Sequence, residues 1–144
     1  MADIGGLAGQ IARIREKVNA LIEKELKNRG IKGIVPAHGS VLFFLLQQSK
    51  PVPIKAVVEN VRRVKSTVTV MINTLEKHGY VRKLPRETDK RMTYVELAPK
   101  GRRLQKDFEE ISQALLSKLY GDMSEKDRDR LVKQLESIES NLSK

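Results

Sequence analysis

The sequence predicts a mainly α-helical protein with one small β-hairpin, and two observations carry this prediction. Apolar residues recur at steps of three and four along most of the chain, which is the spacing of helices that bury one face. One stretch interrupts this pattern, because "YVRKLP" and "MTYVEL" alternate as strands do on either side of a charged loop. With 144 residues, 40% of them hydrophobic and 32% charged, the chain is expected to form one globular domain.

The first helix is expected close to the N-terminus, where Asp3 can cap its start and Gly30 and Gly33 mark its end. Its apolar seam consists of Ile4, Leu7, Ile11, Ile14, Val18 and Leu21. Pro36 suits the first turn of a second helix, which runs through "HGSVLFFLLQQ". That second helix is apolar on most of its sides, so it should be buried.

A helix-turn-helix is predicted in the middle of the chain, after the two prolines of "SKPVP", which suit a short edge strand. Its two apolar stripes consist of Ile54, Val57, Val58 and Val61 and of Val68, Met71, Ile72 and Leu75. A short turn at Arg62 and Arg63 separates the two helices, and Gly79 ends the second. The hairpin that follows makes the motif a winged helix-turn-helix.

Positive charge is concentrated in the same part of the chain. The net charge is +10, and residues 50–91 contain eleven Lys or Arg against four Asp or Glu, whereas residues 92–144 contain ten of each. A basic middle segment favours a polyanion as partner. Nucleic acid is favoured over a membrane surface because no basic amphipathic helix with bulky aromatic residues accompanies the charge.

The second helix of the motif has an exposed side that suits contact with bases. At 100° per residue, the side opposite Val68 carries Ser66, Thr69, Val70, Asn73 and Lys77. Short polar side chains can reach base edges because nothing bulky holds the helix away from a groove. The alternative is a face that is merely solvated, and the charged loop "RETDKR" is open to the same alternative.

Several other classes of protein are not expected. The chain has no cysteine, which excludes disulfides, thiolate metal sites and thiol redox sensing. His38 and His78 lie far apart without a carboxylate cluster, so no metal or cofactor is expected, and His38 suits a core better than a ligand pocket. No phosphate loop or nucleophile motif is present, so no enzyme is expected. The longest apolar run, residues 41–46, is too short to cross a membrane and no export signal is recognised, which predicts a cytoplasmic protein.

The stretch "VKSTVTVMINTLEKHGYVRK", followed by "DKR" and "VELAPKG", resembles the MarR family of bacterial and archaeal transcriptional regulators. The resemblance implies a single domain at 1–144, with the winged helix-turn-helix at 34–97 and dimerisation helices at 1–33 and 98–144. It implies a homodimer that binds a palindromic operator in double-stranded DNA, acting as a repressor. A small-molecule effector is a further partner of many members, but no residues of this chain identify a ligand site.

The resemblance also implies roles for single residues. Lys65, Ser66, Thr67, Thr69 and Asn73 would face the major groove, Arg91 would enter the minor groove, and Asp89 would hold the wing in shape. Arg86 and Lys90 match the basic character of the wing less specifically and would contact phosphates. Apart from the resemblance, Arg62 is expected to contact the backbone because it lies near the turn between the two helices. Two positions depart from the family pattern. Val70 replaces a common arginine and could contact a thymine methyl, and Ala98 replaces the threonine that usually caps the next helix.

The C-terminal third carries two more apolar stripes. They consist of Leu104, Phe108, Ile111, Leu115 and Leu119 and of Leu131, Leu135, Ile138 and Leu142. Ser124 with Asp127 predicts the start of the last helix. These helices could pack on their own domain, but packing between subunits is favoured because the winged part already has a core. A module that binds protein or RNA is the alternative function, and salt-dependent binding to a palindromic DNA duplex would separate the two.

Overall fold

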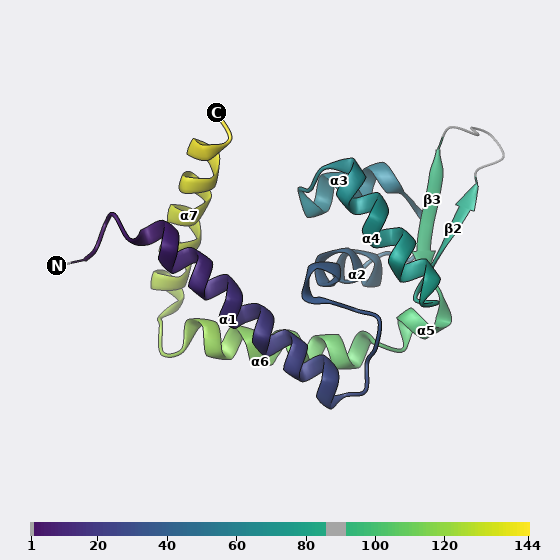
Figure 1. The fold of residues 1–144 in the computed structure, drawn as a ribbon, viewed down its shortest axis with the longest axis horizontal. Helices are drawn as coiled ribbons and strands as arrows, with labels where there is room; N and C mark the ends of the chain where they lie inside the picture. Colours follow the sequence, from purple (N-terminus) through teal and green to yellow (C-terminus); the bar gives the residue numbers. More distant parts are fainter. Residues whose placement is uncertain (1, 86–91) are drawn as a thin grey trace. The chain divides into compact units, whose positions relative to one another are not determined.

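The computed structural model describes residues 2–85 and 92–144, and Figure 1 shows how their helices and strands are arranged. The elements are α1 (Leu7–Asn28), the 3₁₀ turn η1 (Pro36–His38), α2 (Gly39–Leu46), β1 (Val52–Pro53), α3 (Ile54–Val61), α4 (Lys65–Lys77), β2 (Val81–Pro85), β3 (Thr93–Leu97), α5 (Pro99–Arg102), α6 (Gln105–Tyr120) and α7 (Glu125–Leu142). The predicted class, mainly helical with a small β part, is confirmed.

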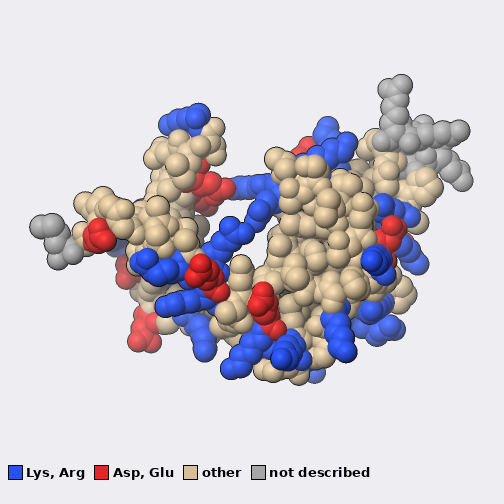
Figure 2. Space-filling view, viewed as in Figure 1, with Lys and Arg blue, Asp and Glu red and all other residues tan. Residues whose placement is uncertain are grey.

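The chain forms two compact units, Met1–Ile111 and Ser112–Lys144. The first contains every element from α1 to the beginning of α6, including the winged helix-turn-helix. The second contains the rest of α6 and the whole of α7. Lys and Arg side chains are frequent on the surface in the space-filling view of Figure 2. None of the helices in the described part of the chain combines the length and apolar composition that a membrane crossing needs.

The sheet of the first unit has three antiparallel strands in the order β1-β3-β2. Val95 of β3 lies opposite Val52 of β1 on one side and opposite Lys83 of β2 on the other. The short edge strand predicted from the prolines is therefore confirmed, since β1 pairs with β3 alone among the described strands. Pro53 is tolerated there because an edge position does not require every backbone N–H.

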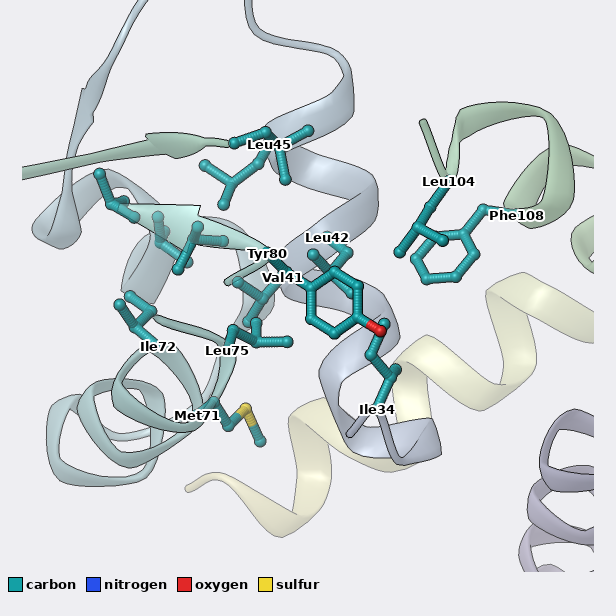
Figure 3. Close-up of a cluster of buried hydrophobic side chains, with 14 of the residues drawn as sticks. Ile34, Val41, Leu42, Leu45, Met71, Ile72, Leu75, Tyr80, Leu104 and Phe108 are labelled. Atoms are coloured by element: carbon teal, nitrogen blue, oxygen red, sulfur yellow. The ribbon is translucent and has the colours of Figure 1, made fainter. Parts of the chain in front are cut away.

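The core of the first unit lies between α2, α4 and the sheet (Figure 3). Helix α4 buries the predicted stripe of Val68, Met71, Ile72 and Leu75, and packs against α2, α3 and β2. Apolar residues from both ends of the unit join this core, namely Leu26 from α1 and Leu104, Phe108 and Ile111 from the segment around α6. The core is thus larger than the helix-turn-helix and hairpin alone would make it.

The second predicted helix is buried as expected, but it begins later than the sequence indicates. Pro36 starts the 3₁₀ turn η1, and α2 proper begins at Gly39. His38 is buried, and its Nδ1 accepts a hydrogen bond from the Val35 backbone N–H at 3.2 Å. Burial, and secondarily His78, lowers the pKa of His38. A neutral histidine in the core fits this position.

The junction between the hairpin and α5 is built around Tyr80. Ala98 begins α5 without a capping side chain, and its backbone N–H donates to the Tyr80 carbonyl at 2.9 Å. Gly101 packs against the same carbonyl so closely that a Cβ atom there would lie 2.3 Å from the oxygen. This contact gives a physical reason for the glycine in the "VELAPKG" stretch.

Arg29, just after α1, ties that helix to α6. Its guanidinium lies 3.0 Å from an Asp107 oxygen, 2.5 Å from a Glu110 oxygen and 3.5 Å from a Glu25 oxygen. Hydrogen bonds to Glu110 and Asp107 raise the pKa of Arg29 further above its usual range. The network fixes the C-terminal end of α1, whereas Ile11 and Ile14 nearer its start are exposed.

The second unit, which is described throughout, has regular, capped helical structure but no buried residues. Ser124 caps α7 by accepting from the Asp127 backbone N–H at 3.1 Å, which confirms the predicted start of the helix. Helix α7, all of whose residues are described, has no buried residue. Its predicted stripe is half-buried at Leu131 and Ile138 and exposed at Leu135 and Leu142.

Candidate nucleic-acid interface

Helix α4 presents one free side opposite its buried stripe. The exposed residues include Lys65, Ser66, Val70, Asn73 and Lys77, and 64% of the Val70 surface is accessible. The predicted exposed side is therefore confirmed for Ser66, Val70, Asn73 and Lys77. Because the opposite side is anchored by fully buried residues, these side chains are held in a fixed register along the helix.

Two of the threonines predicted to face the groove lie at the border of this side. Thr67 and Thr69 are half-buried rather than exposed. Thr69 lines a cavity and Thr67 lies one position before the buried Val68. Their hydroxyl groups thus flank the exposed side rather than occupy its centre, where Val70 and Asn73 lie.

Arg62 occupies a constrained turn between α3 and α4. It ends α3 in the left-handed region, with φ 55° and ψ 40°, and its backbone N–H donates to the Val58 carbonyl at 3.1 Å. A residue with a Cβ costs roughly 1 kcal/mol in this conformation. Arg62 and Arg63 are both exposed, so the tight turn places two guanidinium groups close to the start of α4.

The predicted contacts at the tip of the wing, Arg86, Asp89, Lys90 and Arg91, lie outside the described residues. The hairpin strands β2 and β3 form the base of the wing. Its strands pair in register from Val81 with Leu97 to Pro85 with Thr93. The side chains of Arg82 and Glu96 also form an ion pair across the strands, with 2.6 Å between Nε and Oε1. Lys and Arg side chains gather beside this base at the right of Figure 2.

A cavity of about 670 Å³ lies between the first helix of the motif, α4 and the hairpin. It is lined by Pro53, Ile54, Lys55, Val58, Lys65, Thr69, Lys83, Met92 and Thr93. Three lysines from α3, α4 and β2 thus surround one concave, partly apolar surface. The sequence did not reveal this arrangement, because the three lysines belong to separate elements whose packing brings them together.

Lys83 also makes a contact that sequence reasoning missed. Its Nζ donates to Asn73 Oδ1 at 2.5 Å and lies 3.4 Å from Glu76 Oε1. Its backbone N–H donates to Glu76 Oε2 at 3.1 Å. Glu76 and Lys83 carry opposite charges on either side of the turn at Gly79, and this pattern is visible in the sequence. A helix that turns back into a strand brings such residues together.

The sequence pattern of the MarR family matches residues 38–93, which run from η1 to the start of β3. No curated protein matches the sequence. The S. aureus MepR–DNA complex has a similar structure, with a TM-score of 0.81 and 18% sequence identity, and the alignment covers 98% of this chain and 99% of that chain.

Two further solved structures have the same fold. A mutant MarR from E. coli complexed with operator DNA has a TM-score of 0.77 and 20% identity, over 95% of this chain and 99% of that chain. A MarR-like transcription regulator from Bacillus cereus has a TM-score of 0.72 and 24% identity, over 94% of this chain and 95% of that chain. At these identities the similarity establishes the fold.

Proposed function

We propose that this chain, whose residues 38–93 match the sequence pattern of the MarR family, is a sequence-specific regulator of transcription that binds double-stranded DNA. The observation that supports this most is the free side of α4. It combines short side chains at Ser66, Val70 and Asn73 with cations at Lys65 and Lys77. A helix with this surface fits the major groove, where base edges can be distinguished.

The turn at Arg62 and the wing supply the proposed contacts to the DNA backbone. Arg62 lies in the turn before α4, where a cation can neutralise phosphates on the edge of the groove. Arg91 is proposed to enter the minor groove, with Asp89 shaping the wing and Arg86 and Lys90 contacting phosphates. Such contacts position the protein, whereas the exposed side of α4 selects the sequence.

The active form is proposed to be a homodimer on a palindromic operator. The exposed apolar rows of the terminal helices support this, since Ile11, Ile14, Leu119 and Leu135 are each between 41% and 46% accessible. A two-fold dimer would present two copies of α4 to two half-sites. MepR and MarR, which have the same fold, are seen in complexes with DNA and offer a precedent for DNA binding.

Repression is the proposed outcome, because a dimer on an operator blocks access to the DNA beneath it. A small-molecule effector would act by favouring one spacing of the two copies of α4 over another. The function proposed is regulation of transcription rather than catalysis. It also implies a location with the chromosome, in the cytoplasm.

The proposal is tested by the DNA that the protein selects. Purified protein is mixed with sheared genomic DNA at physiological salt, and the retained fragments are sequenced. We expect enrichment of a palindromic motif, whose affinity as a duplex falls steeply with salt concentration. Retention of fragments without a shared motif, or tighter binding of an RNA duplex than of DNA, would contradict the proposal.

Arg62→Ala serves as the internal control for backbone contact. Alanine keeps a Cβ in the same left-handed conformation, so the backbone cost of the turn is unchanged. Loss of the guanidinium should weaken binding to all duplexes alike and reduce the salt slope by about one unit. Sequence preference should stay the same.

A further inference from the structure

The contact between Asn73 and Lys83 bears on which base the protein reads. The sequence of α4 contains a single side-chain amide, that of Asn73, and it lies at the centre of the exposed side. Its Oδ1 atom accepts from the Nζ of Lys83 at 2.5 Å. The two residues come from α4 and β2, which pack against each other, so the contact joins the helix to the hairpin.

Glu76 holds Lys83 in this position by two contacts. One carboxylate oxygen accepts from the Lys83 backbone N–H at 3.1 Å, and the other lies 3.4 Å from the ammonium. The ammonium is consequently fixed between a carboxylate and an amide oxygen. Because the Lys83 side chain is 31% accessible, it is partly shielded from water, which strengthens both contacts.

The chemistry of the ammonium decides which end of the amide is free. An ammonium has donors only, so the atom of Asn73 that faces it must be the oxygen. The NH2 group of Asn73 keeps its two donors for another partner. A free asparagine could turn either end towards a base, whereas Lys83 fixes the choice.

This orientation disfavours adenine. Asparagine reads adenine by a pair of hydrogen bonds, in which its oxygen accepts from the N6 amino group and its NH2 donates to N7. One lone pair of Asn73 Oδ1 is already used, and the other lies beside a positive charge that repels amino hydrogens. Guanine instead presents two acceptors, N7 and O6, on its major-groove edge.

We infer that Asn73 and Lys83 form one donor-only reading unit that selects guanine over adenine in the operator, with Lys83 as the positioning residue. The inference rests on the proposed function, since it names the base that the exposed side of α4 recognises. The inference gives Lys83 of the hairpin a role in sequence specificity, whereas its charge alone would suggest a contact to phosphate.

The main experiment is a competition assay with every single-base variant of the selected operator. Asn73→Ala identifies the base pair that Asn73 reads, because discrimination should be lost at that pair. The wild-type protein should prefer guanine there by roughly tenfold or more over adenine. Replacing that guanine by 7-deazaguanine, which lacks the N7 acceptor, should weaken binding.

Variants of Lys83 separate orientation from charge. Lys83→Met frees the Asn73 oxygen and should shift the preference at that same pair towards adenine. Lys83→Arg keeps a donor for Asn73 and should restore the guanine preference. Lys55→Met is the matched control, because Lys55 lines the same cavity and has no hydrogen-bond or ion-pair partner among the described residues. It should weaken all sequences alike.

A measurement on the free protein tests the contact apart from DNA. The Asn73 side-chain NH2 signals in an ¹⁵N–¹H correlation spectrum should shift in Lys83→Met and stay in place in Lys55→Met. Circular dichroism checks that each variant is folded. If the signals do not move, the contact is absent and the inference fails.

The outcomes distinguish the inference from the proposed function. A wild-type protein without sequence-selective duplex binding overturns the proposed function, whatever the spectrum shows. A protein that binds its operator but prefers adenine at the Asn73-dependent pair overturns the inference alone. So does Lys83→Met with an unchanged guanine preference.

Discussion

The two units of the molecule differ in how far their apolar side chains are buried. In Met1–Ile111, residues such as Leu42, Ile72 and Leu75 are almost completely buried. In Ser112–Lys144, where every residue is described, none is buried, and 43% of Leu135 and 82% of Leu142 remain accessible. The first unit is therefore stabilised by its own chain, whereas the apolar rows of the second gain burial only against another surface.

The start of α1 follows the pattern of the second unit although it belongs to the first. Its apolar seam is well spaced for a helix, yet Leu7, Ile11 and Ile14 are between 39% and 46% accessible. Towards the other end of the helix, Leu26, close to the Arg29 network, is buried in the core and Ile22 packs against it. The apolar residues at the start of α1 thus lie outside the core of the first unit. A second copy of the chain is proposed to bury them.

The largest effect is expected from disrupting the proposed interface between the two copies of the chain. The double variant Leu135→Glu with Ile138→Glu places two charges in the row of α7, and burying them between subunits would cost several kcal/mol. We expect monomers or insoluble protein in multi-angle light scattering at micromolar concentration. Glu136→Ala with Ser140→Ala, two exposed positions on the same helix, should leave the dimer intact. A well-folded dimer of the Glu variant would show that α7 is not at the interface.

A core substitution in the first unit should cost less, but it should not depend on assembly. Leu75 is fully buried, and Leu75→Ala is expected to lower the free energy of unfolding by about 3 kcal/mol through lost burial and a residual cavity. Urea denaturation at several protein concentrations measures this. The matched variant Val35→Ala, at a position of the same unit that is 51% exposed, should change the free energy of unfolding by less than about 0.5 kcal/mol.

The close packing of α5 on Tyr80 gives the third prediction. Gly101→Ala puts a Cβ 2.3 Å from a backbone oxygen, which only a shift of α5 or the hairpin can relieve. We expect a loss of about 2 kcal/mol in unfolding free energy. Gly39→Ala is the control, because Gly39 has helical geometry and nothing within 4 Å of an added Cβ. That variant should be neutral or slightly stabilising.

The elements of the fold could be predicted where the determining residues are close in sequence. The stripe from Val68 to Leu75 predicted both the existence of α4 and its buried side, because helical periodicity is a local property. Ser124 predicted the start of α7 for the same reason, since a cap reaches only three residues ahead. The start of α2 was placed too early, because the Pro36 turn is 3₁₀ and not α.

The features that could not be predicted depend on contacts between distant segments. Phe43 and Phe108 pack with ring centroids 5.8 Å apart, and no local pattern pairs them. The left-handed conformation of Arg62 was also missed, because glycine or asparagine is the residue that usually marks it. At the candidate site, the exposed side of α4 followed from the helical period, but the hydrogen bond from Lys83 to Asn73 required the packing of β2.

Val70 departs from the difference in burial between the two units. It belongs to the unit that buries its apolar residues, yet 64% of its surface is accessible. Unlike Leu135, it is not part of an apolar row, because its neighbours on the exposed side are Ser66, Asn73 and Lys77. An isolated apolar group among polar ones fits a small apolar target, and the thymine methyl is the apolar group of the major groove.

The last and smallest expected effect tests this contact by removing the methyl from the DNA. Replacing thymine by deoxyuridine at one operator position should weaken wild-type binding about fourfold, because burial of one such group contributes about 0.8 kcal/mol. Val70→Ser should weaken binding to the thymine operator by a similar factor and should no longer respond to deoxyuridine. Titrations of both proteins with both duplexes form a double-mutant cycle, which isolates the contact from changes in DNA flexibility. Equal sensitivity to deoxyuridine in the two proteins would mean that Val70 touches no methyl, and its exposure would then have to be explained by the protein alone.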